Sequence, residues 1–243
     1  TMLASAYYNT RTSNAELVSM TARTIGIGLN PTVRYATDKN EYMTLVGTAI
    51  TQYLDLSGNG NDSLVQATGT ARPTLAQAQQ NGLATATHDG TDFINFPASL
   101  YTIANGNNTV MVMCKRDTES GAANGIIGFR VGTSAYLNLQ YATTAGTVQY
   151  RNAVSTNADS PGNTNTNYAI LAGSLQGATQ RTGVNGGVTV SNNSGTRSAS
   201  VDSAYLGSGS SGINLTGGIG EVMIWNSSLT TGQRQAARYF LWY

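Results

Sequence analysis

Short apolar segments recur along the chain, separated by runs of Gly, Ser, Thr and Asn. One strongly apolar segment is NTVMVMCKR (108–116), and apolar and polar residues alternate in AYLNLQYA (135–142). Segments of this length and period, bounded by turn residues, are typical of β-strands. Further strands are predicted at 49–56, 83–96 (with a turn at Asp89-Gly90), 125–131, 146–152, 167–175, 186–192 and 217–225. Short strands at regular spacing favour an all-β sandwich or barrel.

A hairpin is predicted near the start of the chain. In TVRYATDKNEYMTLV (32–46), two alternating segments flank the turn residues Asp38, Lys39 and Asn40. Turn residues between two β-forming segments are the usual signal of a hairpin. We therefore expect the two segments to pair with each other.

The end of the chain has a different period. In SSLTTGQRQAARYFLWY (227–243), Thr230 and Gln233 have the spacing of a capping box. The apolar positions that follow at helical spacing are Ala236, Ala237, Phe240 and Leu241. One short C-terminal helix is predicted from about Thr231, and its aromatic end is expected to pack on the sandwich. An exposed aromatic tail that binds a partner is the alternative.

The composition favours one large domain with a neutral surface. The chain has 243 residues, of which 40% are hydrophobic and only 10% are charged, and its formal net charge is +1. Asn, Thr, Ser, Gln and Gly must therefore form the polar surface, which suits a β-rich protein. Residues 1–16 show no clean period and are predicted to be an N-terminal arm or linker. Residues 17–243 are predicted to be a single domain.

The same composition argues against two kinds of partner. The chain has no Lys/Arg run to neutralise the phosphates of a nucleic acid, so nucleic-acid binding is not expected. It has no apolar run long enough to span a bilayer, so membrane insertion is not expected. The single cysteine, Cys114, forms no intramolecular disulfide, and its apolar neighbours indicate a small buried hydrophobe.

Three stretches together resemble a known superfamily. They are LDLSGNGNDSLVQATGTARPT (54–74), HDGTDFINFP (88–97) and GIGEVMIWNSSLTTGQRQAARYFLWY (218–243). Their motifs and their order are similar to those of the concanavalin A-like lectin/glucanase superfamily, in its laminin-G-like branch. That branch commonly shows a D-x-S-G-N-G-N-D/H loop, a DG-S/T-D strand entry and a closing GEV/I-I-Y/W-N-x-x-L-T/S strand. VRYATDKNEYMTL (33–45) is similar to a hairpin that precedes this loop in many phage-encoded and secreted members.

The resemblance covers roughly residues 32–243, although 98–217 are matched only by their strand rhythm. It implies a jelly-roll sandwich of two antiparallel sheets with Asn/Gly-rich loops at the rim. It implies no activity, because the superfamily includes lectins, hydrolases, adhesion modules and structural proteins.

Candidate catalytic residues are sparse. Glucanases of this superfamily carry an E-x-D-x-x-E or E-x-D-x-E run, and glycan hydrolysis generally needs a pair of carboxylates. Glu221 in GEVMIW has no acidic neighbour two or four residues further on, and is expected to bond to a neighbouring backbone group or to an arginine. A pair that Glu221 forms with Asp92 has no positive support. His88 is the only histidine, and no G-x-S-x-G motif is present. We therefore expect a protein that is not an enzyme.

The loop after the predicted strand 49–56 suggests either a calcium site or a self-capped turn. From Asp55 it reads Asp-x-Ser-x-Asn-Gly, a neutral variant of the calcium-loop pattern. Calcium binds roughly six to eight oxygens, and Gln66 stands where the pattern has a bidentate Glu. The candidate ligands are Asp55, Ser57, Asn59 and Asp62. The alternative, which we favour, is that such side chains cap the loop's own backbone as Asx-turns do.

Two neighbouring strands are candidates for binding a saccharide. Sugar rings stack on aromatic side chains, and their hydroxyls exchange hydrogen bonds with a few placed polar groups. Alternation puts polar and aromatic side chains on one face of 135–142 and of 146–152. The candidates are Tyr136, Asn138, Gln140, Gln149 and Arg151. The alternative is an ordinary solvated strand face with tyrosines in the core.

The favoured hypothesis is a non-enzymatic surface or structural protein of a virion, such as a phage tail fibre, spike or capsid-decorating protein. Its lectin-like domain would attach to cell-surface glycan or to other virion proteins, and its arm would dock to the particle or to sister subunits of a homo-oligomer. The low charge, the absence of disulfides and the loop motif motivate this hypothesis. The alternative is a carbohydrate-binding module of a secreted polysaccharide-degrading enzyme, and a hydrolase in its own right is a third. Both leading hypotheses place the protein at a virion surface or outside the cell.

Overall fold

A computed structural model describes residues 29–118, 123–143, 146–152, 158–161, 166–192, 200–209 and 212–242 of the protein. Within these residues the strands form two antiparallel sheets, and one α-helix follows the last strand. The described part of the chain is therefore all-β with a short C-terminal helix, as predicted. The predicted arm at 1–16 lies outside the described residues.

The larger sheet contains ten strands within the described ranges. In spatial order along the sheet they are β14 (Thr189–Asn192), β13 (Thr179–Val184), β12 (Ala169–Gln176), β7 (Asn108–Arg116), β16 (Thr216–Trp225), β5 (Leu83–Asp89), β4 (Thr74–Gln80), β3 (Ala49–Tyr53) and β2 (Met43–Val46). The remaining strand, β1 (Val33–Ala36), pairs with β16 off this path. The last strand of the chain thus lies in the middle of the sheet.

The smaller sheet contains six described strands. Their spatial order is β11 (Ala158–Pro161), β10 (Thr147–Asn152), β9 (Ser134–Tyr141), β8 (Asn124–Val131), β15 (Ser203–Leu206) and β6 (Ile94–Asn95). Short 3-10 helices lie in three of the connections: η2 (Asn40–Tyr42), η3 (Gly69–Ala71) and η4 (Ala98–Asn105).

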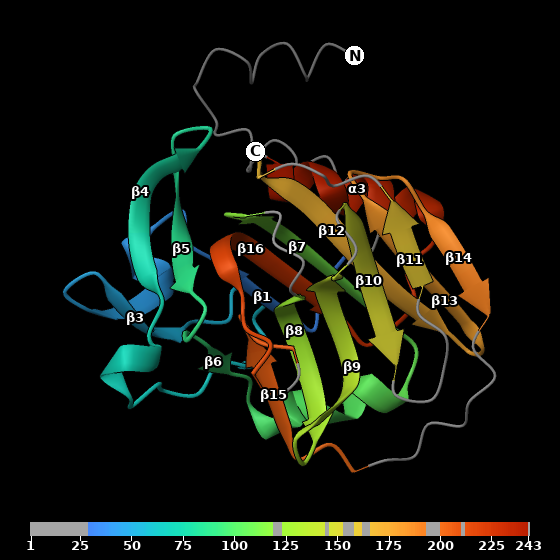
Figure 1. Ribbon diagram of the computed structural model, residues 1–243, viewed down its shortest axis with the longest axis horizontal. Coiled ribbons are helices and arrows are strands. Elements are labelled where there is room, and N and C mark those ends of the chain that lie inside the picture. Colours follow the sequence, from blue (N-terminus) through green and yellow to red (C-terminus); the bar gives the residue numbers. More distant parts are fainter. Residues whose placement is uncertain are drawn as a thin grey trace.

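The main core fills the space between the two sheets, which pack face to face (Figure 1). Alternation along the strands decides which side chains enter it, because successive residues of a strand point to opposite faces. The inward set includes Val110, Val112 and Cys114 of β7 and Leu137, Leu139 and Tyr141 of β9. Burial of this apolar surface is the main favourable term that holds the layers together.

A column of aromatic rings crosses the main core. Tyr35 of β1 stacks on Tyr53 of β3 with ring centroids 5.5 Å apart. Tyr35 also stacks on Phe96 at 5.8 Å, and Phe96 stacks on Phe129 of β8 at 6.1 Å. Such ring pairs add to the burial term, so this column links the larger sheet to the smaller one.

The helix α3 (Thr231–Trp242) covers a second, smaller core on the other face of the larger sheet. The buried members of this cluster are Met111, Met113, Ile170, Met223, Trp225, Leu229, Ala237 and Leu241. The Thr230 N–H donates to Gln233 Oε1 (2.8 Å), and the Gln233 N–H donates to Thr230 Oγ1 (3.3 Å). The predicted capping box and helix are confirmed. The side chains of Tyr239, Phe240 and Trp242 lie outside the described residues.

The predicted hairpin at 32–46 is wrong. β1 pairs with β16, and β2 pairs with β3. The turn residues between β1 and β2 lead into η2 instead of a tight reversal. The reason is that β1 buries Val33 and Tyr35 in the main core beside the last strand, a contact between segments nearly two hundred residues apart that no local pattern can indicate.

Several strands were not predicted. The sequences of β4 (TLAQAQQ) and β13 (TQRTGV) are mostly polar, and that of β15 (SAYL) is short. In β13 Gln180 and Thr182 are buried although they are polar, because their side chains form hydrogen bonds around Tyr150 of β10. Burial of hydrogen-bonded polar groups costs little. Such a strand can therefore be buried without the apolar residues by which a strand is recognised in the sequence.

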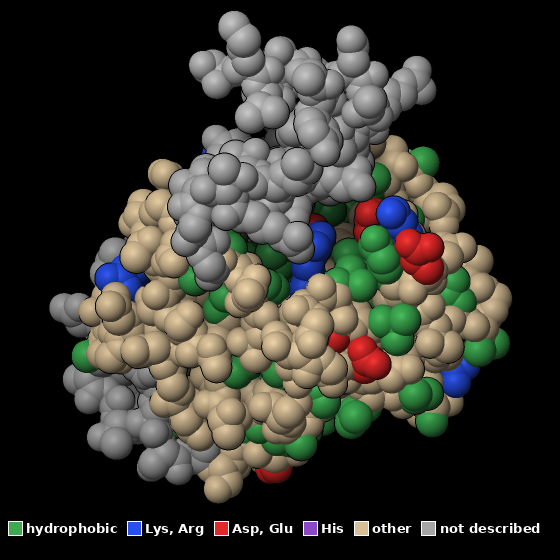
Figure 2. All heavy atoms as spheres, turned by 180° about the vertical axis from the view of Figure 1, so that it is seen from behind, with side chains coloured by type: hydrophobic (Ala, Val, Ile, Leu, Met, Phe, Trp, Pro, Cys, Tyr) green, Lys and Arg blue, Asp and Glu red, His purple; other side chains and the backbone are tan. Residues whose placement is uncertain are grey.

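The visible surface is poor in charge, as the composition requires. In Figure 2 the Lys/Arg and Asp/Glu side chains form separate spots on a face that is mostly neutral. The helices formed by the described residues are all too short or too polar to cross a membrane.

The capping box gives a test of the helix. Replacing Thr230 with Ala removes the side-chain acceptor for the Gln233 N–H, and we expect the free energy of unfolding to fall by about 1 kcal/mol. Thr230→Ser keeps the hydroxyl and should match the wild type. Chemical denaturation of the three proteins measures both effects, and equal stability of the Ala and Ser variants would contradict the cap.

Candidate functional site

The candidate saccharide residues come from β9 and β10 of the smaller sheet. Because Leu139 and Tyr141 enter the main core, Asn138 and Gln140 point to the outer face of the sheet. In the ladder between the strands, Gln149 lies opposite Gln140. Arg151 lies opposite Asn138 in the same ladder. The structure therefore brings four of the five predicted residues to one face.

A chain of amide hydrogen bonds crosses this face. Asn138 Nδ2 donates to Gln140 Oε1 at 2.8 Å, and Gln140 Nε2 donates to Gln149 Oε1 at 2.9 Å. Gln140 and Gln149 thus each use the carbonyl oxygen to accept from the preceding amide, whereas the buried Asn138 Oδ1 has no hydrogen-bond partner among the described residues. The last member, Gln149, is half-buried, and its own NH₂ group donates to neither of the other two amides. The direction of the chain makes this group a donor held in a fixed orientation.

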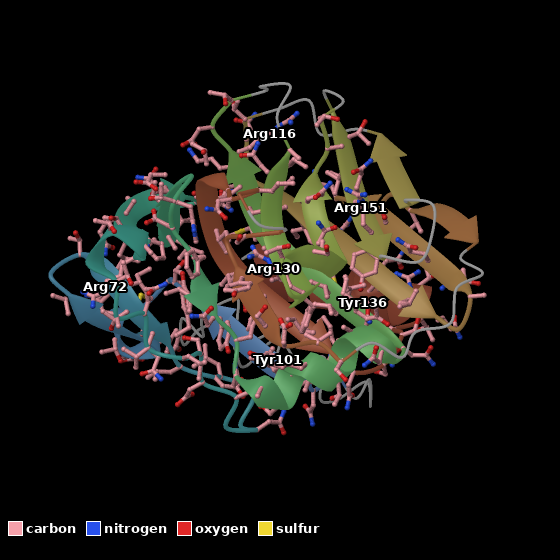
Figure 3. The ribbon with its side chains drawn as sticks, turned by 60° about the horizontal axis from the view of Figure 1, so that its bottom comes forward. Arg72, Tyr101, Arg116, Arg130, Tyr136 and Arg151 are labelled. Carbon is pink, nitrogen blue, oxygen red and sulfur yellow. The ribbon has the colours of Figure 1, made fainter. Side chains whose placement is uncertain are left out.

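The five candidate saccharide residues differ in their exposure to solvent. Asn138 and Gln140 are 1% and 2% exposed, and Tyr136 is 5% exposed and packs in the main core cluster. Gln149 is half-buried and Arg151 is exposed. Figure 3 shows Tyr136 and Arg151 on this part of the molecule. Of the predicted set, only Gln149 and Arg151 are therefore accessible, and Gln140 beneath them bonds to Gln149.

The loop between β15 and β16 lies across the outer face of β8. A Cβ atom added at Gly125 would stand 2.0 Å from the Gly209 nitrogen, and one added at Gly128 would stand 2.1 Å from the Gly209 oxygen. A Cβ atom added at Gly209 would lie 3.2 Å from Asn138 Nδ2. The glycines thus allow two backbones to approach closely, and the loop buries the inner end of the amide chain.

Arg130 and Tyr205, which the sequence did not single out, form the other end of this face. The Arg130 guanidinium lies 4.2 Å from the centre of the Tyr205 ring, and its Nε donates to the Gly209 oxygen at 2.7 Å. Phe93 packs edge-on against Tyr205 at 5.4 Å. Arg130 lies in a predicted strand, but Tyr205 lies in β15, which the sequence did not predict, so no sequence signal joined the two residues.

Asp55 organises the loop for which calcium was considered. Its Oδ1 accepts the backbone N–H groups of Arg34 (3.0 Å) and Ser57 (2.9 Å). Its Oδ2 accepts the Asn61 N–H (2.9 Å) and the Ser57 hydroxyl (2.8 Å). Both carboxylate oxygens therefore bond to the loop, and Oδ1 also bonds to β1, which lies beside it.

The remaining candidate calcium ligands also bond locally. Asp62 Oδ1 accepts the Asp55 N–H at 2.7 Å, and Asn59 Nδ2 donates to the Pro31 oxygen at 3.0 Å. These are the hydrogen bonds of a self-capped loop. Among the described residues no group of three or more His, Cys, Asp and Glu side chains could hold a metal ion. Calcium binding through Asp55, Ser57, Asn59 and Asp62 stays a prediction.

Glu221 forms an ion pair, as expected from its sequence context. Its Oε1 lies 2.6 Å from Arg34 Nε, between strands β16 and β1. Burial raises the pKa of Glu221 to about 7, and the charge of Arg34 and its hydrogen bond oppose this shift. Asp92, the other acid considered, accepts the Asp89 N–H at 3.0 Å, and burial raises its pKa to about 6.

His88 and Cys114 are both buried. Burial lowers the pKa of His88 to about 4, and its Nδ1 lies 3.4 Å from the Asp92 carbonyl oxygen. Burial raises the pKa of Cys114 to about 12, and its Sγ lies 3.6 Å from Tyr141 Oη. The prediction that Cys114 is a buried hydrophobe is confirmed. Neither side chain has the exposure that a nucleophile or general base needs.

A scan against protein-family models and a search of curated proteins found no match. Solved structures do match. The sialidase of Trypanosoma rangeli in complex with sialic acid gives a TM-score of 0.61 at 12% identity, over 86% of this chain and 32% of the sialidase. The chain therefore spans about a third of the length of that protein.

Two matches are separate domains. Domain 4 of a GH43 extracellular arabinanase from Geobacillus stearothermophilus, in complex with arabinotriose, gives a TM-score of 0.58 at 15% identity, over 86% of this chain and 97% of that domain. The CBM40 of the Ruminococcus gnavus IT-sialidase, bound to α2,3-sialyllactose, gives 0.50 at 15% identity, over 64% of this chain and 92% of that one. At these identities the likeness concerns the fold, and it supports a two-sheet β-sandwich.

The buried His88 predicts a dependence of stability on pH. The folded protein keeps His88 neutral down to about pH 4, whereas the unfolded chain protonates it below about 6.5. Between these values the unfolded state binds more protons, so the contribution of His88 to stability rises with pH. Relative to a His88→Gln variant, the wild type should gain up to about 3 kcal/mol across this window.

Chemical denaturation of both proteins at several pH values measures this difference. The comparison removes the effects of Asp92 and Glu221, whose raised pKa values act in the opposite direction and are common to both proteins. A difference in unfolding free energy that stays constant between pH 4 and 6.5 would show that His88 is not desolvated as described.

Proposed function

We propose that this chain is a carbohydrate-binding domain whose sandwich is a jelly roll of the concanavalin A-like type. The observation that carries the proposal is the likeness in fold to two domains solved with a bound oligosaccharide, one of which is covered over 97% of its length. The neutral, amide-rich surface and the D-x-S-G-N-G-N-D loop motif add support.

The outer face of the smaller sheet is the proposed binding surface. Gln149 offers an oriented NH₂ donor, because Gln140 already occupies its carbonyl oxygen. Arg151 is exposed one step further along the same strand face and adds a planar set of donors. Donors that are held in place before binding lose little freedom when a sugar hydroxyl accepts from them. The amide chain from Asn138 supplies that support.

Of the two contexts considered, a carbohydrate-binding module of a secreted polysaccharide-degrading enzyme has the better support. Both oligosaccharide-bound neighbours are named as parts of glycan-degrading enzymes, and the sialidase that matches is about three times as long as this chain. We propose this context and an extracellular location. None of these neighbours is a virion protein, so the virion role, its protein partners and homo-oligomer formation stay predictions without support from them.

Binding can be tested with a panel of plant, bacterial and animal oligosaccharides that includes arabinotriose and α2,3-sialyllactose. We expect at least one class to bind, and Gln149→Ala or Arg151→Ala to weaken that binding by about 3- to 10-fold, the loss of one or two hydrogen bonds. Isothermal titration calorimetry measures the affinities. Gln77→Ala, an exposed position on β4, is the matched control and should bind like the wild type. Unchanged affinity of both face variants would contradict the proposed surface.

We propose further that the domain is not an enzyme. Glu221 is buried and paired with Arg34, so its carboxylate is engaged in structure. Carboxyl groups that act as general acids nevertheless often have a pKa raised to near 7. Glu221 has such a pKa, so it is the residue to test. We expect no turnover of any polysaccharide in the panel. Turnover that disappears in Glu221→Gln, while the variant keeps its fold, would overturn this proposal.

A further inference from the structure

A groove lies on the opposite side of the protein, between α3 and the outer face of the larger sheet. Met111, Ile170 and Ala172 form an apolar floor. The turn at 186–188 forms one wall, and the first two turns of α3 form the other. The groove continues along β12 and β13 through a second hollow that shares Ala172 with the first.

Arg234 of α3 lies where the two hollows meet. Its Nη1 donates to the Leu229 carbonyl oxygen at 2.5 Å, and its Nη2 lies 3.1 Å from Thr231 Oγ1. These bonds fix the guanidinium at the start of the helix. Burial lowers the pKa of Arg234, and the nearby charge of Arg181 adds to this shift. Arg181 and Arg234 both line the second hollow, so two positive charges border the same partly desolvated space.

Arg181 reaches the groove from β13, directly opposite Ser174 of β12 in the ladder. Its Nη1 contacts Gln176 Oε1 at 3.3 Å, a neutral partner. Ser174 lines the same hollow and is only 1% exposed, yet within the described part of the chain its hydroxyl has no hydrogen-bond partner. A buried hydroxyl without a partner is uncommon in folded proteins and calls for an explanation.

Among the described side chains, no carboxylate forms an ion pair with either arginine. The ion pairs between described side chains are Arg34–Glu221, Lys39–Glu41 and Lys115–Asp117. Neither Arg181 nor Arg234 takes part in one. Like charges at close range repel each other, and the repulsion is stronger where apolar walls exclude water. An anion placed between them would remove this cost.

We propose that the groove beside α3 binds an oxyanion, with Arg181 and Arg234 on either side and the Ser174 hydroxyl as a third donor from the floor. The guanidinium group matches oxyanions because it presents several N–H donors in one plane. The apolar floor of Met111 and Ile170 fits the carbon body that carries the anionic group. This site is separate from the proposed saccharide face, which belongs to the other sheet.

The test uses three small probes on the whole chain: inorganic sulfate, inorganic phosphate and acetate, at an ionic strength kept constant with chloride. Backbone amide shifts in an NMR titration report binding. We expect saturable shifts at Ser174, Arg181 and Arg234. Tighter binding of sulfate and phosphate than of acetate assigns the site to sulfate or phosphate groups, and the reverse order assigns it to carboxylates. The absence of saturable shifts at these residues with all three probes would overturn the proposal.

Variants separate a specific site from general charge effects. Arg181→Gln should weaken binding about tenfold, the loss of one charge-assisted partner, and Lys39→Gln, which removes an exposed positive charge elsewhere, should not. Ser174→Ala should weaken binding without lowering the free energy of unfolding, because its hydroxyl has no partner to lose. Unchanged affinity in both Arg181→Gln and Ser174→Ala would overturn the proposal. Saccharide binding at Gln149 should be the same in every one of these variants. The oxyanion proposal and the saccharide proposal can therefore be contradicted independently of each other.

Discussion

The structure depends on the pairing of β16 with strands from three other parts of the chain. One edge of β16 pairs with β7, and the other edge pairs first with β5 and then with β1. The change of partner coincides with a bulge after Ile219, where the Thr37 hydroxyl bonds to the carbonyl oxygens of both Ala84 and Gly220. Both faces of β16 are also buried, one in the main core and one beneath α3. This strand is therefore paired along both edges and contributes side chains to both hydrophobic cores, so both cores depend on its position.

The position of β16 also determines the candidate saccharide face. The loop that enters β16 passes over β8, where Gly125 and Gly128 leave room for its backbone. That loop covers Asn138 and receives a hydrogen bond from Arg130. The inner end of the amide chain on β9 and β10 is therefore covered, and of the five candidate residues only Gln149 and Arg151 remain accessible. The groove beside α3 depends on β16 as well, because Met223 and Trp225 belong to the cluster on which the helix packs.

The sequence predicted individual strands well where their side chains alternate, as in β7 and β9, and it predicted the helix from the capping residues Thr230 and Gln233. It did not predict pairing between distant segments, so β1 was assigned to a hairpin that does not form. It placed Asn138 and Gln140 on the correct face but not beneath a covering loop. It missed Arg130 and Tyr205 because their contact joins two strands that lie far apart in the chain. Local patterns report which way a side chain points, whereas burial and neighbours depend on how the sheets assemble.

The central claim is that the outer face of the smaller sheet binds a saccharide. The most direct measurement is an NMR titration of the labelled chain with the tightest-binding member of the oligosaccharide panel. We expect shifts of the side-chain amide of Gln149 and of the backbone amides around Arg151, with little change around α3. Shifts confined to another surface, or no shift with any member of the panel, would contradict it.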